Sequence, residues 1–321
     1  MNGAADSAQG WHTPVPEAHP AAALLSAAAV RRHCGEVFAQ VAAGNSAHFI
    51  WHGERLPEAA RGVAALTRER YPHLNIPYHS RWRHFSAGGI DRWAMLARRY
   101  RLEGDEAVRS MIDLTITSAL LDAGAGNSWR YADREFGATL GRSEGLAAAS
   151  IALFAAGVLS DRGDQPLRAD AAALMRVREG HIVKFFQVDH IANPLTGVEG
   201  RAQLMRNLGV VAAATPAVFG QPARIGNLFD YLLGHSTNHT LPATFILDTL
   251  LRALAPLWPD REVLDGVPLG DCWRHPAATG GRVPFHKLTQ WLTYSLLDPL
   301  EVAGIAVTGL DELTGLPEYR N

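Results

Sequence analysis

The sequence predicts a mostly α-helical protein with few or no short strands, and three observations predict it. Apolar residues recur at helical spacing in segments that begin and end at Gly or Pro. Short strand-like runs do not recur along the chain, and no βαβ alternation is present. Apolar residues make up 47% of the 321 residues and charged residues 19%, which is the composition of a globular protein.

The helical segments follow one another from residue 21 onward. "AAALLSAAAVRRHCGEVFAQVAAG" predicts a helix or helix pair that ends at Gly44, and "GDEAVRSMIDLTITSALLDAG" predicts a helix that ends at Gly124. The same patterns predict further helices at 55–72, 91–100, 141–157, 166–180, 200–209, 227–235, 242–258 and 284–298. "HIVKFFQVD", residues 181–189, is the best strand candidate because it is rich in Val and aromatic residues, with a buried helical turn as the alternative.

The domain organisation follows from the same reading. Residues 1–20 contain three prolines and no periodicity, so we expect a flexible N-terminal tail. Residues 21–321 are long enough for one sizeable core, and we expect a single helical domain. Two lobes with a site between them are the alternative to one undivided body. The sequence leaves the oligomeric state open.

Charge and composition exclude several classes of partner. The net charge of −2 provides no basic field, so we expect no nucleic-acid partner. The apolar run at 21–30 is too short to span a bilayer, and no Lys or Arg precedes it, so we expect a cytoplasmic protein with no membrane partner. Cys34 and Cys272 are too few for a disulfide framework or a four-Cys zinc site.

The common cofactor and catalytic motifs are absent. The chain has no dinucleotide-binding or P-loop glycine motif, no G-x-S-x-G, no H-E-x-x-H and no C-x-x-C. We therefore expect no cofactor and no resident metal.

A first polar and aromatic cluster lies in "IPYHSRWRHF", residues 76–85. It contains His79, Arg81, Trp82 and Arg83, and Arg side chains suit phosphate or carboxylate groups while Trp offers a stacking face. The alternative is a loop anchored by Trp82 with solvated arginines. His79 and His84 could ligate a metal, but no third ligand has an obvious spacing.

Two further clusters combine an acid, a Trp and an Arg. In 120–144 they are Asp122 at a helix end, Trp129 and Arg142, although Ser143 could simply cap the next helix. In "LGDCWRHP" the corresponding residues are Asp271, Trp273, Arg274 and His275, in a loop where sites concentrate. Cys272 reads as a small buried residue rather than a nucleophile.

The fourth cluster joins the helix at 284–298 to the C-terminus. Lys287, Gln290, Tyr294 and Asp298 fall on one helix face, which is either an ordinary wet surface or the lining of a site. "LDELTGLPEYRN" contains a short G-L-P turn followed by Glu318. The alternative is that Glu318 lies near a helix N-terminus, where the helix dipole favours a carboxylate, and has no catalytic role.

These tracts together resemble a known family. "YPHLNIPYHSRWRHFSAGGIDRW", "LLDAGAGNSWRY", "GRSEGLA", "LGDCWRHP", "VPFHKLTQWLTYSLLDPLEVAG" and "LTGLPEYRN" are similar to the uracil-catabolism (URC pathway) family of fungi and bacteria, long classed as a domain of unknown function. The resemblance covers roughly residues 22–321. The family pattern continues past "EYRN" with a glycine-rich stretch, so a truncated chain and a short member are both compatible with it.

A second resemblance bears on mechanism. The tract "VPFHKLTQWL…GLDELTGLPEYR" is similar to the C-terminal tract of queuosine-salvage N-glycosidases, which share a helix–hairpin–helix glycosylase-like bundle. The matching positions are Lys287 and Glu318, 31 residues apart (318 − 287), and the salvage enzymes have Asp in place of Glu318. The resemblance therefore implies a helical catalytic domain over 21–321.

The two resemblances imply a hydrolase that cleaves the C–N glycosidic bond of a ribosylurea- or nucleoside-type intermediate carrying a 5′-phosphate. Glu318 is the candidate carboxylate, and Lys287 would hold it ionised or bind a substrate oxygen. The substrate-binding candidates are His79, Arg81, Trp82, Arg83, Asp122, Trp129, Arg142, Asp271, Trp273, Arg274, His275, His286, Gln290, Tyr319 and Arg320.

Two other functions remain open at this point. One is a metal-dependent amidohydrolase or ring-opening enzyme of the same pathway, with His79, His84 or His275 as ligands. The other is a non-catalytic partner that binds a pathway intermediate.

Overall fold

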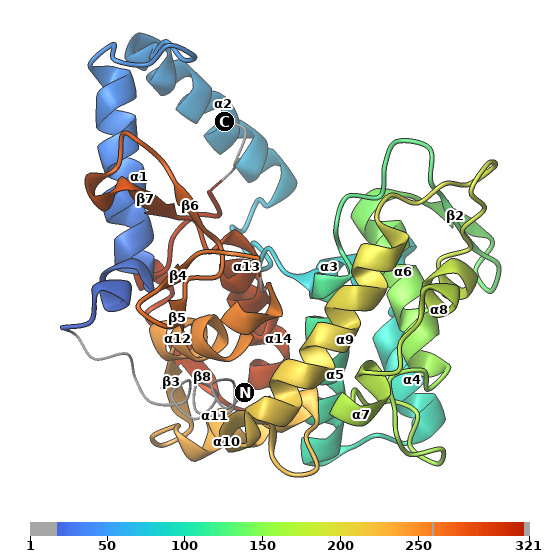
Figure 1. The fold of residues 1–321 in the computed structure, drawn as a ribbon. Helices are drawn as coiled ribbons and strands as arrows, with labels where there is room; N and C mark the ends of the chain where they lie inside the picture. Colours follow the sequence, from blue (N-terminus) through green and yellow to red (C-terminus); the bar gives the residue numbers. More distant parts are fainter. Residues whose placement is uncertain (1–17, 259, 318–321) are drawn as a thin grey trace.

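A computed structural model describes residues 18–258 and 260–317. The described chain is mostly helical, as the sequence predicts, and its strands are short (Figure 1). The α-helices are α1 (Ala27–Ala42), α2 (Leu56–Arg70), α3 (Arg81–Phe85), α4 (Arg92–Tyr100), α5 (Gly104–Leu120), α6 (Arg142–Ala155), α7 (Ala171–Leu174), α8 (Glu179–Phe185), α9 (Val198–Ala214), α10 (Pro216–Phe219), α11 (Leu228–Gly234), α12 (Ala243–Leu254), α13 (Lys287–Ser295) and α14 (Leu297–Val302). Short 3₁₀ turns are η2 (Pro20–Leu24), η3 (Gly53–Arg55), η4 (Ala87–Gly89), η5 (Ile225–Asn227), η6 (Ala255–Leu257), η7 (Thr279–Gly281) and η8 (Leu310–Glu312).

Helix α5 forms the centre of the core. Its residues from Ser110 to Leu120 are all buried, so the side chains on every face of this helix are either apolar or hydrogen-bonded to other groups of the protein. Figure 1 shows α5 and α9 running through the middle of the molecule, with α4, α6, α7 and α8 on one side and α12, α13 and α14 on the other. The helices of both sides contribute to one continuous apolar cluster.

The strands pair into four two-stranded sheets within the described residues. β1 (Tyr131–Asp133) and β2 (Ala138–Leu140) are antiparallel, as are β4 (Val263–Leu264) with β5 (Val267–Pro268) and β6 (Cys272–Arg274) with β7 (Arg282–Pro284). β3 (Thr240–Pro242) and β8 (Ala306–Thr308) are parallel, with Leu241 opposite Val307. This parallel pair brings the chain that leaves α14 back beside the start of α12.

Some sequence-based boundaries are wrong. Residues 181–189 are not a strand: α8 occupies most of them, and Ile182 and Phe186 turn into the core one helical turn apart. The predicted helix at 284–298 is β7 followed by α13 and α14, with a break at Leu296. Pro299 does not end this region, because it lies in the first turn of α14, where its missing N–H costs little.

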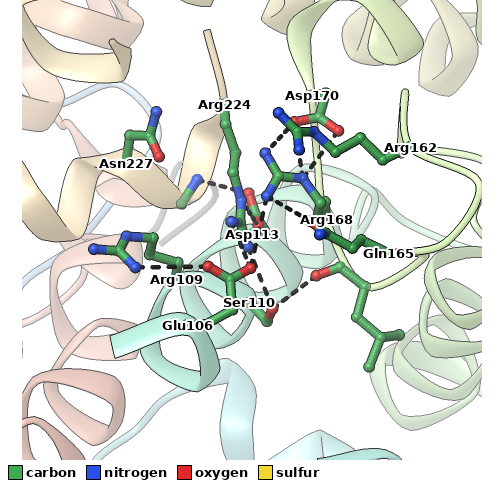
Figure 2. A network of polar contacts seen from close by, with 12 residues as sticks. Glu106, Arg109, Ser110, Asp113, Arg162, Gln165, Arg168, Asp170, Arg224 and Asn227 are labelled. Atoms are coloured by element: carbon green, nitrogen blue, oxygen red, sulfur yellow. Dashed lines mark hydrogen bonds and ion pairs between the residues drawn. The ribbon is translucent and has the colours of Figure 1, made fainter. Parts of the chain in front are cut away.

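A buried ionic network holds α5 against the loop at 167–170 and against η5 (Figure 2). The guanidinium of Arg224 donates to Asp113 and Glu106, in both cases over 2.7 Å, and to the hydroxyl of Ser110 over 3.3 Å. The backbone N–H of Gly226 donates to the other oxygen of Asp113 over 2.6 Å. Burial raises the pKa of Asp113 to about 6, and the adjacent Arg224 opposes that shift.

Candidate functional site

A pocket of about 480 Å³ lies where three segments meet that are far apart in the sequence. Its lining residues come from the segment before α3, from one face of α13, and from the chain after η8: Tyr78, His79, Lys287, Tyr294, Thr314, Gly315 and Leu316. A volume of several hundred Å³ is in the range of small-molecule sites. Lys287 is the lysine on this wall, and the only other lysine in the sequence is Lys184 on α8.

The start of α13 is fixed by residues that the sequence singled out. One carboxylate oxygen of Asp271 accepts the backbone N–H of Lys287 over 2.9 Å, and the other accepts the indole N–H of Trp273 over 2.9 Å. His286 is fully buried with a φ of +46°, and its Nε2 lies 2.8 Å from the carbonyl oxygen of Leu24. Burial lowers the pKa of His286. These contacts place Lys287 at the first position of the helix, at the pocket wall.

The chain after η8 is held against α13 by hydrogen bonds to Thr314. The side-chain oxygen of Gln290 accepts both the backbone N–H and the hydroxyl of Thr314, and its amide nitrogen donates to the carbonyl of Phe285 over 3.2 Å. The hydroxyl of Tyr294 donates to the carbonyl of Thr314 over 2.9 Å, and burial raises the pKa of this phenol. Thr314 is therefore fixed against α13, and the segment 314–316 forms one wall of the pocket.

The opposite wall is attached to α14. The hydroxyl of Tyr78 donates to Glu301 over 2.8 Å, and the hydroxyl of Ser80 donates to Asp298 over 2.9 Å. Arg83 donates to the second oxygen of the Asp298 carboxylate over 3.1 Å. Asp298 thus binds the residues around α3. Lys287 and Tyr294, which the sequence places on the same helix face as Asp298, line the pocket instead.

Arg81 is fully buried in the core beside this site. Its Nε donates to the hydroxyl of Ser118 over 2.8 Å, and its Nη1 donates to Asp122 over 2.9 Å and to the carbonyl of Ser143 over 3.2 Å. Burial lowers the pKa of Arg81 to about 10, and Asp122 opposes this shift. Arg81 therefore joins α3, α5 and α6 at one point.

Trp291 connects Arg81 to the pocket. Its ring centroid lies 6.2 Å from that of His79, which lines the pocket, and 6.1 Å from that of His84. The guanidinium carbon of Arg81 lies 5.9 Å from the same ring. Burial lowers the pKa of His84, with Arg81 as the next cause. Nη2 of Arg81 and Nε1 of Trp291 are both buried and have no hydrogen-bond partner within 18–258 and 260–317.

Two of the predicted tryptophans lie in the core. The indole of Trp129 is fully buried and donates to the carbonyl of Phe186 over 2.9 Å. Trp82 packs edge-on against Phe85 and Trp93, with centroid distances of 5.1 and 5.8 Å. The structure does not place either indole in the lining of the pocket.

Other predicted residues lie at the surface, outside the pocket lining. Arg274 forms an ion pair with Glu262 over 2.7 Å, and His275 is exposed in the turn after β6. Trp273 is partly covered by Arg261, whose guanidinium carbon lies 3.9 Å from the ring. Arg142 is exposed at the first position of α6.

Glu318, Tyr319 and Arg320 lie outside the described residues. Sequence reasoning missed Tyr78, Thr314 and Leu316 as lining residues, although Tyr78 adjoins His79 in a tract that it did quote.

Two other types of site are absent from the described residues. In the described parts of the chain, no group of three or more His, Cys, Asp or Glu side chains is arranged to hold a metal ion. Among the same residues, no helix combines the length and the apolar character needed to pass through a bilayer.

Comparison with known proteins gives one family and two relatives. Residues 23–321 match the family described as "Protein of unknown function (DUF1688)". The chain is 37% identical to "Uracil catabolism protein 4" of Lachancea kluyveri over 327 aligned residues, which cover 94% of this chain and 74% of the relative. It is 36% identical to "Protein urg3" of Schizosaccharomyces pombe, again over 94% of this chain and 74% of the relative. No solved structure is significantly similar to the chain.

Proposed function

The chain belongs to the DUF1688 family, and from that premise we propose that it acts in uracil catabolism as an N-glycosidase. The proposed substrate is a ribosylurea- or nucleoside-type compound, with a 5′-phosphate on the ribose. The proposed fold is the helix–hairpin–helix glycosylase-like bundle of the queuosine-salvage enzymes.

One observation carries the proposal. Lys287 faces the same pocket as the segment 314–316, and Glu318 follows Leu316 by two residues in the sequence. Glu318 itself lies outside the described residues. We propose that its carboxylate acts in the pocket that Lys287 lines, although 31 residues separate the two in the sequence (318 − 287).

The proposed reaction breaks the bond between the anomeric carbon and nitrogen. The bonding electron pair leaves with the nitrogen, which takes up a proton, and positive charge develops on the sugar. The carboxylate of Glu318 stabilises that charge and accepts a proton from the water whose oxygen bonds to the anomeric carbon. The ammonium group of Lys287 keeps Glu318 ionised or binds a substrate oxygen. The products are urea or a base and the free sugar or its phosphate.

The anionic end of the substrate needs donors near this pocket. His79 lines it, and Trp291 joins it to Arg81, whose Nη2 is buried and unpartnered in the described structure. We assign His79 to substrate binding. Arg81 is fully buried and outside the pocket lining, so we assign it a positioning role behind Trp291, with Asp122 orienting Arg81.

The residues around α13 have positioning roles in this proposal. Asp271 and His286 fix the start of the helix, and Gln290 fixes Thr314, so the three together set the geometry between Lys287 and the chain that leads to Glu318. Gln290 acts through the protein backbone rather than through the substrate, because its oxygen and its amide nitrogen are both bonded to protein groups.

The test is a direct assay with four compounds. The full chain is incubated with ribosylurea, its 5′-phosphate, uridine and uridine monophosphate, and urea, base and reducing sugar are measured. We expect sugar and its nitrogen partner in equal amounts from one of the four, unchanged by a metal chelator. Glu318→Gln and Lys287→Met should each lower the rate by about a hundredfold or more.

Lys184→Met is the matched control, since Lys184 is the other lysine of the chain and lies exposed on α8. Its rate should equal that of the natural protein. Full turnover by Glu318→Gln would overturn the site assignment. Cleavage of none of the four compounds would overturn the reaction, and loss of turnover with chelator would support the metal-dependent alternative.

A further inference from the structure

The most unusual surface of the molecule is the N-terminal arm, residues 38–76, which comprises the end of α1, the following loop, α2 and the segment before the pocket. Figure 1 shows α2 and the outer end of α1 rising away from the rest of the molecule. Ten of the seventeen exposed large apolar residues in the described chain lie in this arm: Phe38, Phe49, Ile50, Trp51, Leu56, Val63, Leu66, Tyr71, Leu74 and Ile76. The arm is therefore an apolar surface that residues 18–258 and 260–317 leave uncovered.

Helix α2 shows the feature most clearly. It has fifteen residues, and none of them is buried. Isolated helices of this length are marginal in water, and most helices in proteins are stabilised by packing of one apolar face. Leu56, Ala59, Ala60, Val63 and Leu66 follow the i, i+3, i+4, i+7, i+10 spacing of such a face. The sequence of α2 thus encodes a contact that the described part of the chain does not make.

We propose that the N-terminal arm is the interface of a homodimer, in which α2 of one copy packs on α2 of the other. The exposed apolar area of the arm is sufficient for a dimer interface. Large apolar residues exposed by 37 to 84% present on the order of 100 Å² each. Together the ten expose about 1,000 Å², which exceeds the roughly 800 Å² per partner that a standard interface buries.

The shape of the apolar stripe on α2 is suited to a two-fold contact. A two-fold interface uses the same patch on both copies. That patch must therefore contain both protruding side chains and the recesses that accept them. The apolar stripe of α2 does this, because Ala59 and Ala60 leave room beside Val63 for a large side chain such as Leu66 of the other copy.

The charge of α2 and its flanking turn also favours a second copy of the chain as the partner. Residues 54–70 contain four Arg and three Glu, a net charge of +1. This near-neutral balance lacks the strong basic field that binding to nucleic acid or to an anionic membrane surface uses. It also allows two identical copies to approach without strong repulsion.

The test is the mass of the full chain in solution, measured by light scattering after size exclusion over about a hundredfold range of concentration. We expect a dimer of twice 34.8 kDa that dissociates only on dilution. The double variant Val63→Glu/Leu66→Glu should be a monomer with unchanged circular dichroism, because neither side chain is buried. The matched control Ile191→Glu/Val210→Glu, at exposed apolar positions outside the arm, should remain a dimer.

A second readout does not depend on disrupting the interface. A cysteine at the centre of the stripe, Val63→Cys, should form a disulfide-linked dimer on mild oxidation, whereas Ile191→Cys should not. A natural chain that is monomeric at every concentration overturns the proposal, as does a Val63→Glu/Leu66→Glu variant that stays dimeric. The proposal is also overturned if the chain is monomeric alone and forms a larger complex only with a different protein.

Discussion

The side-chain oxygen of Gln290 accepts two hydrogen bonds from Thr314, one from the backbone N–H over 3.2 Å and one from the hydroxyl over 2.6 Å. Gln290 is fully buried on α13, one helical turn after Lys287, and Thr314 lies in the pocket wall. This pair fixes the wall that leads to Glu318 relative to the helix that carries Lys287. It is the contact on which the proposed site geometry depends.

Gln290→Leu tests this role. The leucine leaves the N–H and hydroxyl of Thr314 and the carbonyl of Phe285 without their partner, at a cost of about 1–3 kcal/mol in unfolding free energy. Limited proteolysis should then cut the chain near 314–317, and kcat should fall more than KM rises. Gln203→Leu, at an exposed position on α9, is the control and should change neither readout. Unchanged proteolysis of Gln290→Leu would show that Thr314 is held by other contacts.

Arg81 and Arg83 lie two residues apart, yet only Arg81 is buried. Arg81→Met leaves the Asp122 carboxylate in the interior without its cation, which should destabilise the fold by about 3–5 kcal/mol. Arg83 has a side chain that is 50% exposed, and its ion pair with Asp298 should contribute at most about 1 kcal/mol. Urea unfolding of Arg81→Met and Arg83→Met measures both values, and equal losses would contradict the burial difference.

The buried His286 predicts a loss of stability in acid. Burial lowers its folded pKa, so below its ordinary value of 6.5 the unfolded chain binds a proton that the folded chain does not. Its contribution to the unfolding free energy is therefore complete above that pH and declines as the pH falls. His286→Gln removes this titration while keeping a donor for the carbonyl of Leu24. The decrease in urea midpoint between about pH 7.5 and about pH 5 should be smaller in this variant.

His275→Gln is the control for that experiment, because His275 is exposed and its replacement should leave the pH dependence as it is in the natural protein. His84 is also a histidine whose pKa is lowered by burial, so part of the acid sensitivity should persist in His286→Gln. An identical pH dependence in His286→Gln and the natural chain would mean that His286 does not contribute.

Two glycines of α9 give opposite predictions. A Cβ at Gly209 would lie 2.6 Å from the backbone oxygen of Ala171 and 2.9 Å from the backbone nitrogen of Met175. Gly209→Ala should therefore force α9 away from α7 and cost about 1–3 kcal/mol. A Cβ at Gly200 meets nothing within 4 Å, so Gly200→Ala should stabilise the helix by about 0.5–1 kcal/mol. Thermal melting of the two variants should shift the midpoint in opposite directions.

The sequence alone was sufficient for the elements whose pattern is local. α5 and α12 have long helical periodicity, and they are present where it predicts them, whereas α9 extends beyond the predicted 200–209 at both ends. Residues 181–189 were misassigned because a short apolar run with Val and Phe has no period long enough to separate a strand from a buried helical turn. The tracts that carry the family resemblance are also local, and the DUF1688 match over 23–321 confirms that assignment.

The tertiary structure decided every feature that depends on residues far apart in the chain. Arg224 finds Asp113 and Glu106, 111 and 118 residues away, and no local pattern marks these partners. The pocket likewise joins Tyr78, Lys287 and Leu316 only because packing brings three distant segments together. Periodicity shows which residues share a face, and the packing of the whole chain determines what that face contacts. That is why the polar face of α13 was visible in the sequence, while its division into Lys287 at the pocket and Gln290 in the interior was not.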